Sequence, residues 1–134
     1  NKYEHDLLAR QSGMPFARIA ASVGAVVVTS GSDDITLLSG GRGTSFHTVK
    51  PDEVRDASGA GDAFLAGFSF GRLKGLSTEQ CVSVAATAAS FAVETTGTQQ
   101  HIFTTDQFQQ RLEINFGKQN FDLSTNNSPV EKNP

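Results

Sequence analysis

The chain has 134 residues, of which 37% are hydrophobic and 19% charged, which suits one domain with a modest core. Its 11 Lys and Arg residues and 14 Asp and Glu residues give a net charge of −3. No basic cluster could neutralise a nucleic-acid backbone or hold an anionic membrane. The longest uncharged apolar run, residues 23–29, is far too short to span a bilayer. We therefore predict a soluble, cytoplasmic protein with no nucleic-acid or membrane partner.

The cysteine and histidine residues give no sign of a metal centre. A single cysteine, Cys81, excludes an internal disulfide and a Cys-rich zinc site. The three histidines, His5, His47 and His101, lack metal-ligand spacing. We interpret each histidine as a surface or structural residue.

The first half of the chain reads as two short helices followed by three strands. Apolar residues at helical spacing near the N-terminus are interrupted by a glycine and a proline, which predicts two helices. The β-branched residues 25–29 predict a strand buried on both faces of a parallel sheet. Residues 35–38 and 44–49 predict two more strands, and the glycine-rich residues between them predict a hairpin.

The second half of the chain predicts three helices. An apolar pattern runs from Asp62 to Leu73, and Gly75 lies where a C-terminal cap is expected. Ser77 and Gln80 have the spacing of a capping box, in which each side chain satisfies the backbone N–H of the other. The helix that follows has a face of small residues suited to close packing or to a flat ligand: Val82, Ala85, Ala86, Ala89 and Val93.

The last predicted helix begins at Thr104, which forms a second capping-box pattern with Gln107. Beyond Gly117 the sequence is polar and without period, so we predict that residues 118–134 are disordered. Residues 1–117 are then one structural unit.

The segment Asp56–Phe64 is a small-residue loop that leads directly into a helix. Gly59 and Gly61 permit backbone conformations in which successive N–H groups converge on one anion, and the positive end of the helix reinforces them. Asp62, at the start of this helix, could either cap it or accept a proton from a substrate hydroxyl. The G-x-x-x-x-G-K-[ST] phosphate loop and the three-glycine dinucleotide pattern are both absent.

Residues Asp56–Phe68 resemble the C-terminal signature of the ribokinase-like (PfkB) family of carbohydrate and nucleoside kinases, which normally reads D-T-x-G-A-G-D. The resemblance implies the C-terminal part of a three-layer α/β/α sandwich, with a parallel sheet, a β-hairpin and helices on both faces. It also implies transfer of the ATP γ-phosphoryl group to a sugar hydroxyl. Asp62 would be the catalytic base, and the backbone N–H groups of Gly59, Ala60 and Gly61 would form the anion hole.

Two further segments match the family in the expected order. Asn1–Glu4 resembles its N-x-x-E motif, which implies that Asn1 and Glu4 organise Mg²⁺. Thr29–Gly31 resembles its nucleotide loop at a strand end. The resemblance implies a set of nucleotide-binding residues: Thr29, Gly31, Asp56, Ser58 and Gly97.

A finer resemblance points to the bacterial adenosine kinase branch, through residues 1–8 and 94–99. It implies that adenosine is the acceptor and that ATP and Mg²⁺ are used. The residues themselves decide neither a K⁺ requirement nor a homodimer of the complete protein. Ribose, fructose or another nucleoside stays open as acceptor, and so does a non-catalytic nucleotide-binding role.

The sequence also departs from the family pattern. Ser58 stands where threonine is usual, and it keeps the hydroxyl. Asp34 replaces a glycine, so either Asp34 tolerates a positive φ or the turn differs. The chain opens on Asn1 rather than Met and matches only the nucleotide half of the family. We therefore expect a C-terminal part of a longer protein that is inactive in isolation.

Overall fold

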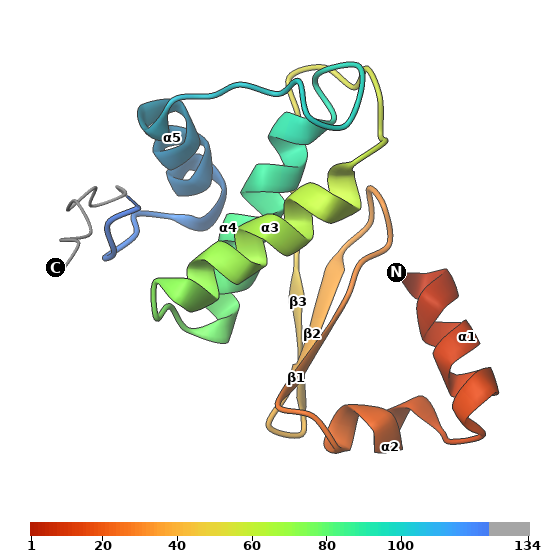
Figure 1. Ribbon diagram of the computed structural model, residues 1–134. Helices are drawn as coiled ribbons and strands as arrows, with labels where there is room; N and C mark the ends of the chain where they lie inside the picture. The colour runs from red at the N-terminus through yellow and green to blue at the C-terminus, as the bar shows by residue number, and fades with distance from the viewer. Residues whose placement is uncertain (124–134) are drawn as a thin grey trace, which may run out of the picture.

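The computed structural model describes residues 1–123. In Figure 1 the strands lie between helices α3–α5 and the pair α1–α2. No helix within the described range is long and apolar enough to cross a membrane. The elements, in chain order, are α1 (Lys2–Ser12), α2 (Phe16–Ala21), β1 (Ala25–Val28), β2 (Ile35–Ser39), β3 (Arg42–Phe46), α3 (Ala60–Leu73), α4 (Thr78–Ala92) and α5 (Thr105–Phe116).

The helix boundaries are set by the capping residues that the sequence indicates. Ser77 Oγ accepts a hydrogen bond from the Gln80 N–H, and the Gln80 side chain accepts one from the Ser77 N–H. The same reciprocal pair joins Thr104 and Gln107 at the start of α5. Gly13, with a φ of 64°, ends α1 in the left-handed conformation. Both predicted capping boxes are confirmed.

The three strands form one sheet in the order β1-β2-β3, and both pairs are antiparallel. The predicted hairpin between β2 and β3 is confirmed. Its turn residues, Gly40 and Gly41, have φ values of 57° and 75°, and two positive φ angles are what a type I′ hairpin turn requires.

The prediction of a parallel sheet around residues 25–29 is wrong for these three strands. Short connections join β1 to β2 and β2 to β3, and they can only return the chain antiparallel, since a parallel pair needs a crossover of a dozen or more residues. All four residues of β1 are half-buried rather than fully buried.

Helices α3 and α4 pack closely because glycines of α3 face α4. A Cβ on Gly67 would lie 2.9 Å from the Ala85 Cα, and one on Gly71 would lie 2.9 Å from the Cys81 Sγ. Of the predicted small-residue face of α4, Ala85 thus serves close packing against α3. On its other side, α4 packs against the sheet through a cluster made of Ile35, Leu37, Val49, Val82 and Ala86.

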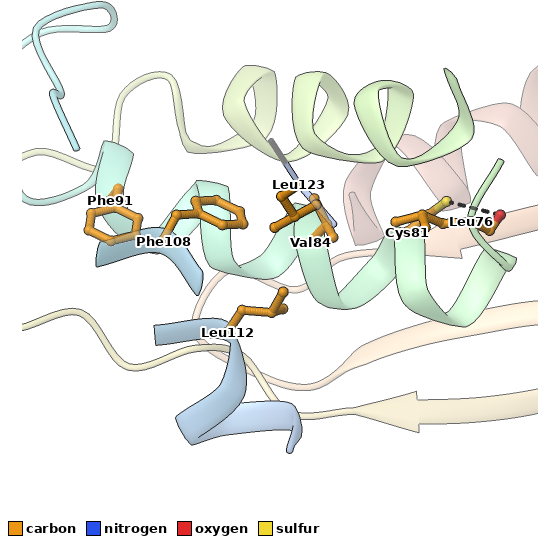
Figure 2. Close-up of a cluster of buried hydrophobic side chains, with 7 residues drawn as sticks. All are labelled: Leu76, Cys81, Val84, Phe91, Phe108, Leu112 and Leu123. Atoms are coloured by element: carbon orange, nitrogen blue, oxygen red, sulfur yellow. Dashed lines mark hydrogen bonds between the residues drawn. The ribbon is translucent and has the colours of Figure 1, made fainter. Parts of the chain in front are cut away.

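A second buried cluster joins α4 to α5 and extends beyond the end of α5. Figure 2 shows its members: Leu76, Cys81, Val84, Phe91, Phe108, Leu112 and Leu123. Leu123 is 7% exposed, and Asn120 accepts a hydrogen bond from the Gln80 side chain (3.2 Å). The start of the predicted disordered tail, residues 118–123, therefore packs on the core through apolar side chains that its polar composition obscured. Residues 124–134 lie outside the described range.

Candidate active site

The loop before α3 presents free backbone donors at the positive end of a helix. Gly59 is the N-cap residue, with a φ of 82°, and no side chain caps the helix. Within the described part of the chain, the N–H groups of Gly59, Gly61 and Asp62 have no hydrogen-bond partner. The Ala60 N–H instead donates to the Ala57 carbonyl (3.3 Å). The N–H groups of Gly59 and Gly61 are thus free within the described residues, whereas that of Ala60 is engaged in the turn.

Asp62 is the third residue of α3, and its side chain is exposed. Its carboxylate makes no hydrogen bond or ion pair with any described residue, so it does not cap the helix. A carboxylate in the first turn also interacts favourably with the positive end of the helix dipole. Of the two roles that the sequence leaves open, the geometry keeps Asp62 free to accept a proton from a bound hydroxyl.

Asp56 shapes the loop rather than facing the pocket. One carboxylate oxygen accepts the Gly97 N–H (3.0 Å) and the other accepts the Ser58 N–H (2.8 Å). These bonds, that from Gly97 foremost, hold the pKa of Asp56 below its ordinary value. The 94–98 loop also touches the helix start, because a Cβ on Gly59 would lie 3.0 Å from the Thr98 Cα. Asp56, Ser58 and Gly97 therefore join two loops that are far apart in sequence.

The end of β1 lies beside the start of α1. The Thr29 carbonyl accepts a hydrogen bond from the Lys2 N–H (3.1 Å), and Gly31 turns the chain with a φ of 66°. Asp34, which replaces a family glycine, does not have a positive φ, so the turn itself differs. Its carboxylate accepts a hydrogen bond from the Ser45 hydroxyl (3.1 Å) and is held toward β3.

Asn1 and Glu4 form a capping box at the start of α1. The Asn1 side chain accepts the Glu4 N–H (3.0 Å), and the Glu4 carboxylate contacts the Asn1 amino nitrogen. No group of three or more metal-binding side chains is found among residues 1–123. Any Mg²⁺ at this place would be held by the exposed Glu4 carboxylate, by water and by substrate phosphates, a donor set that Mg²⁺ accepts.

A pocket of about 450 Å³ lies between these segments. Of the predicted site residues, Thr29, Gly31, Ala60 and Gly61 line it. Asn1, Glu4, Asp56, Ser58, Gly59, Asp62 and Gly97 do not contribute to its lining. Ser58 and Gly97 are hydrogen-bonded to Asp56 beside the pocket-lining residues Ala57 and Ala60, and Asp62 directly follows the lining residue Gly61 in α3.

Sequence reasoning missed most of the pocket's apolar wall. Val49, Pro51 and Val54 come from the segment after β3, and Phe64 comes from α3. Lys50 adds a cation whose side chain has no ion-pair partner within the described residues. No local pattern marks these residues, since they become neighbours only when the 48–54 segment folds over α4. The small face of α4 was the one available signal, and Ala86, Ala89 and Val93 do line the pocket.

The chain resembles nucleoside kinases and ribokinases from several organisms. It is 32% identical over 113 residues to the nucleoside kinase of Methanocaldococcus jannaschii, which covers 84% of this chain and 37% of that protein. The solved structure of that enzyme superposes with a TM-score of 0.79. A Burkholderia thailandensis nucleoside kinase in complex with inosine gives a TM-score of 0.82 at 26% identity, over 86% of this chain and 39% of the other.

A plant ribokinase and a protein-family model also match the chain. The Arabidopsis thaliana ribokinase complexed with ribose and ATP gives a TM-score of 0.66 at 29% identity, over 79% of this chain and 38% of that one. These neighbours confirm the ribokinase-like α/β fold. This chain spans well under half of the length of each of them. The model for pfkB family carbohydrate kinases matches residues 3–105. The chain therefore belongs to the pfkB family of carbohydrate kinases.

Proposed function

We propose that this chain is the nucleotide-binding part of a kinase that transfers the γ-phosphoryl group of ATP to a hydroxyl group of a nucleoside. The observation that carries the proposal is the arrangement of polar groups at the start of α3. There, N–H groups and a carboxylate that have no partner among residues 1–123 lie at a positive helix end, next to an apolar-walled pocket. Phosphoryl transfer depends on positioning and charge stabilisation, and this arrangement supplies both.

Each part of the site has a distinct task. The apolar wall, which includes Val49 and Val93, suits the flat base of a nucleotide. We assign the phosphates of that nucleotide to the part of the pocket lined by Gly31 and the start of α3. The N–H groups of Gly59 and Gly61 stabilise negative charge that develops during transfer. Asp62 accepts the proton of the acceptor hydroxyl. Mg²⁺, when bound to the phosphates, neutralises part of their charge.

Adenosine is the acceptor that we propose first. Residues 1–8 and 94–99 support the adenosine kinase branch through sequence resemblance, and relatives named nucleoside kinase match the chain. A sugar acceptor is the second candidate, favoured by the match to a ribokinase complexed with ribose. A preference for a free sugar of tenfold or more in kcat/KM, about 1.4 kcal/mol of transition-state binding, would favour the second candidate. No contact among residues 1–123 supports a K⁺ requirement or a homodimer.

A substitution at Gly61 tests the proposed anion site in the complete protein. Gly61 lines the pocket, and a Cβ there would meet no described atom within 4 Å, so we expect Gly61→Val to keep the fold. We expect turnover with ATP and adenosine to fall by on the order of 10²-fold, because the side chain occupies the phosphate path. Thermal unfolding serves as the control for folding. A folded variant with wild-type turnover would contradict the proposal.

A further inference from the structure

Arg111 of α5 lies at the centre of a shielded cluster beside the candidate site. Its side chain is only 14% exposed, and its guanidinium carbon lies 3.7 Å from the centre of the Phe91 ring. It forms an ion pair with Glu94 (2.8 Å) and donates a hydrogen bond to the Ser90 hydroxyl (3.1 Å). Arginine suits this place because its planar fork can bond several partners while it stacks on an aromatic ring.

Glu94, the ion-pair partner of Arg111, connects this cluster to the segment of residues 52–56 beside the pocket. The Glu94 carboxylate also accepts the backbone N–H of Asp52 (2.7 Å). The neighbouring Val93 carbonyl accepts the N–H groups of Arg55 (2.8 Å) and Asp56 (3.2 Å). Arg111 therefore holds residues 90–94 at the point where the 52–56 segment is hydrogen-bonded to them.

The connection continues to the anion loop. Asp56 holds the Gly97 and Ser58 N–H groups with its carboxylate. Ser90 and Val93 also line the pocket directly. A displacement of residues 90–94 would therefore reach both the pocket wall and the donors at Gly59 and Gly61.

The burial of the ion pair makes such a displacement the expected result of losing Arg111. The Glu94 side chain is 19% exposed, whereas the second carboxylate near Arg111, that of Asp52, is 90% exposed. Removal of one partner from a shielded pair leaves an uncompensated charge, which must find water or another donor. Glu94 would then draw the end of α4 and the Asp52 backbone with it.

We propose that Arg111 is a positioning residue for phosphoryl transfer, acting through Glu94 on the segments that hold the anion loop. This inference rests on the proposed function, because it assigns Arg111 a role in that reaction. Arg111 does not itself line the pocket or contact the loop. A purely structural role would lower stability and leave the kinetics of the folded protein unchanged.

The test compares Arg111→Met with Arg55→Met in the complete protein. Arg55 pairs with Glu53 (2.8 Å), both side chains being more than half exposed, so the control removes the same charge from the surface near the same loop. We expect Arg111→Met to lower kcat on the order of 10- to 100-fold, the effect of a small misplacement, with a smaller change in the KM for the acceptor. Arg55→Met is expected to keep wild-type kinetics. The double variant Arg111→Met with Glu94→Gln is expected to regain part of the loss, because it removes the uncompensated charge.

Hydrogen exchange of the free protein gives a readout that does not depend on activity. The amides of Ser58 and Gly97 should exchange faster in Arg111→Met and at the wild-type rate in Arg55→Met. Wild-type kcat and exchange in a folded Arg111→Met protein would overturn the inference. If Arg111→Met does not fold, Arg111→Lys is measured instead, because it keeps the positive charge and loses the planar guanidinium donors. A reduced kcat in Arg111→Lys supports the inference, and a wild-type kcat overturns it. A wild-type protein without turnover would refute the proposed function, and the exchange comparison would still decide whether Arg111 positions the loop.

Discussion

Gly59→Ala tests whether the start of α3 depends on a backbone that only glycine adopts freely. Gly59 has a φ of 82°, and an added Cβ would lie 3.0 Å from the Thr98 Cα and 3.1 Å from the Thr98 Cβ. Placing alanine in the left-handed region costs about 1–2 kcal/mol. The tight contact with Thr98 would be relieved only by a shift of the 94–98 loop, which costs about 1–3 kcal/mol more. We therefore expect the free energy of unfolding to fall by about 2–5 kcal/mol.

The matched control is Gly75→Ala. Gly75 has a similar φ of 74°, but a Cβ there would meet nothing within 4 Å, so only the backbone cost of about 1–2 kcal/mol applies. Chemical denaturation of the complete protein measures both variants. Equal losses of stability at the two positions would refute the close approach of Gly59 to Thr98. Turnover should also fall in Gly59→Ala alone, because the 94–98 loop must move.

Three further predictions concern packing, acid stability and metal dependence. Gly71→Ala should destabilise the protein by about 1–3 kcal/mol in denaturation experiments, since its Cβ would meet the buried Cys81 Sγ at 2.9 Å; a neutral variant would contradict the α3–α4 packing. Asp56 has a lowered pKa in the folded state, so its contribution to stability is present above about pH 4 and is lost as the pH falls below that value. Thermal unfolding of Asp56→Asn should thus vary less between pH 5 and 3 than that of the wild type, and equal pH dependence would argue against these bonds. If Glu4 helps to hold Mg²⁺, Glu4→Ala should raise the Mg²⁺ concentration that gives half-maximal rate; an unchanged titration would leave Glu4 a helix-capping acid.

Local patterns predicted the helices and the hairpin correctly, because their determinants lie within a few residues of one another. The capping boxes at Ser77 and Thr104 and the glycine turn at Gly40 need no distant partner to be recognised. The direction of the sheet was wrong for residues 25–29 because an apolar run shows burial and does not show which strand pairs with it. The same limit applied to residues 118–123, where Leu123 reaches the core from a polar segment.

For the candidate site too, local sequence predicted some features and could not predict those that depend on distant contacts. The Asp56–Phe68 motif predicted a glycine loop that leads into a helix, and α3 does begin after Gly59, since glycine spacing and a helix start are both local features. It could not show that Ala60 donates to Ala57 and that Asp56 turns to Gly97. The pocket wall at residues 49–54 and the role of Arg111 depend on contacts across more than 15 residues of sequence, which no spacing rule describes.

We propose that Asp62 acts as the base beside a helix-end anion site. The most direct measurement is the steady-state turnover of Asp62→Asn in the complete protein with ATP and adenosine, together with ATP binding by calorimetry. Asp62 is exposed and unpaired within the described residues, so the substitution should leave folding unchanged. We predict that turnover falls by roughly 10²–10⁴-fold while the Kd for ATP changes little. Near-wild-type turnover in the folded variant would contradict a role for Asp62 as the base and leave it an ordinary acid in the first turn of a helix.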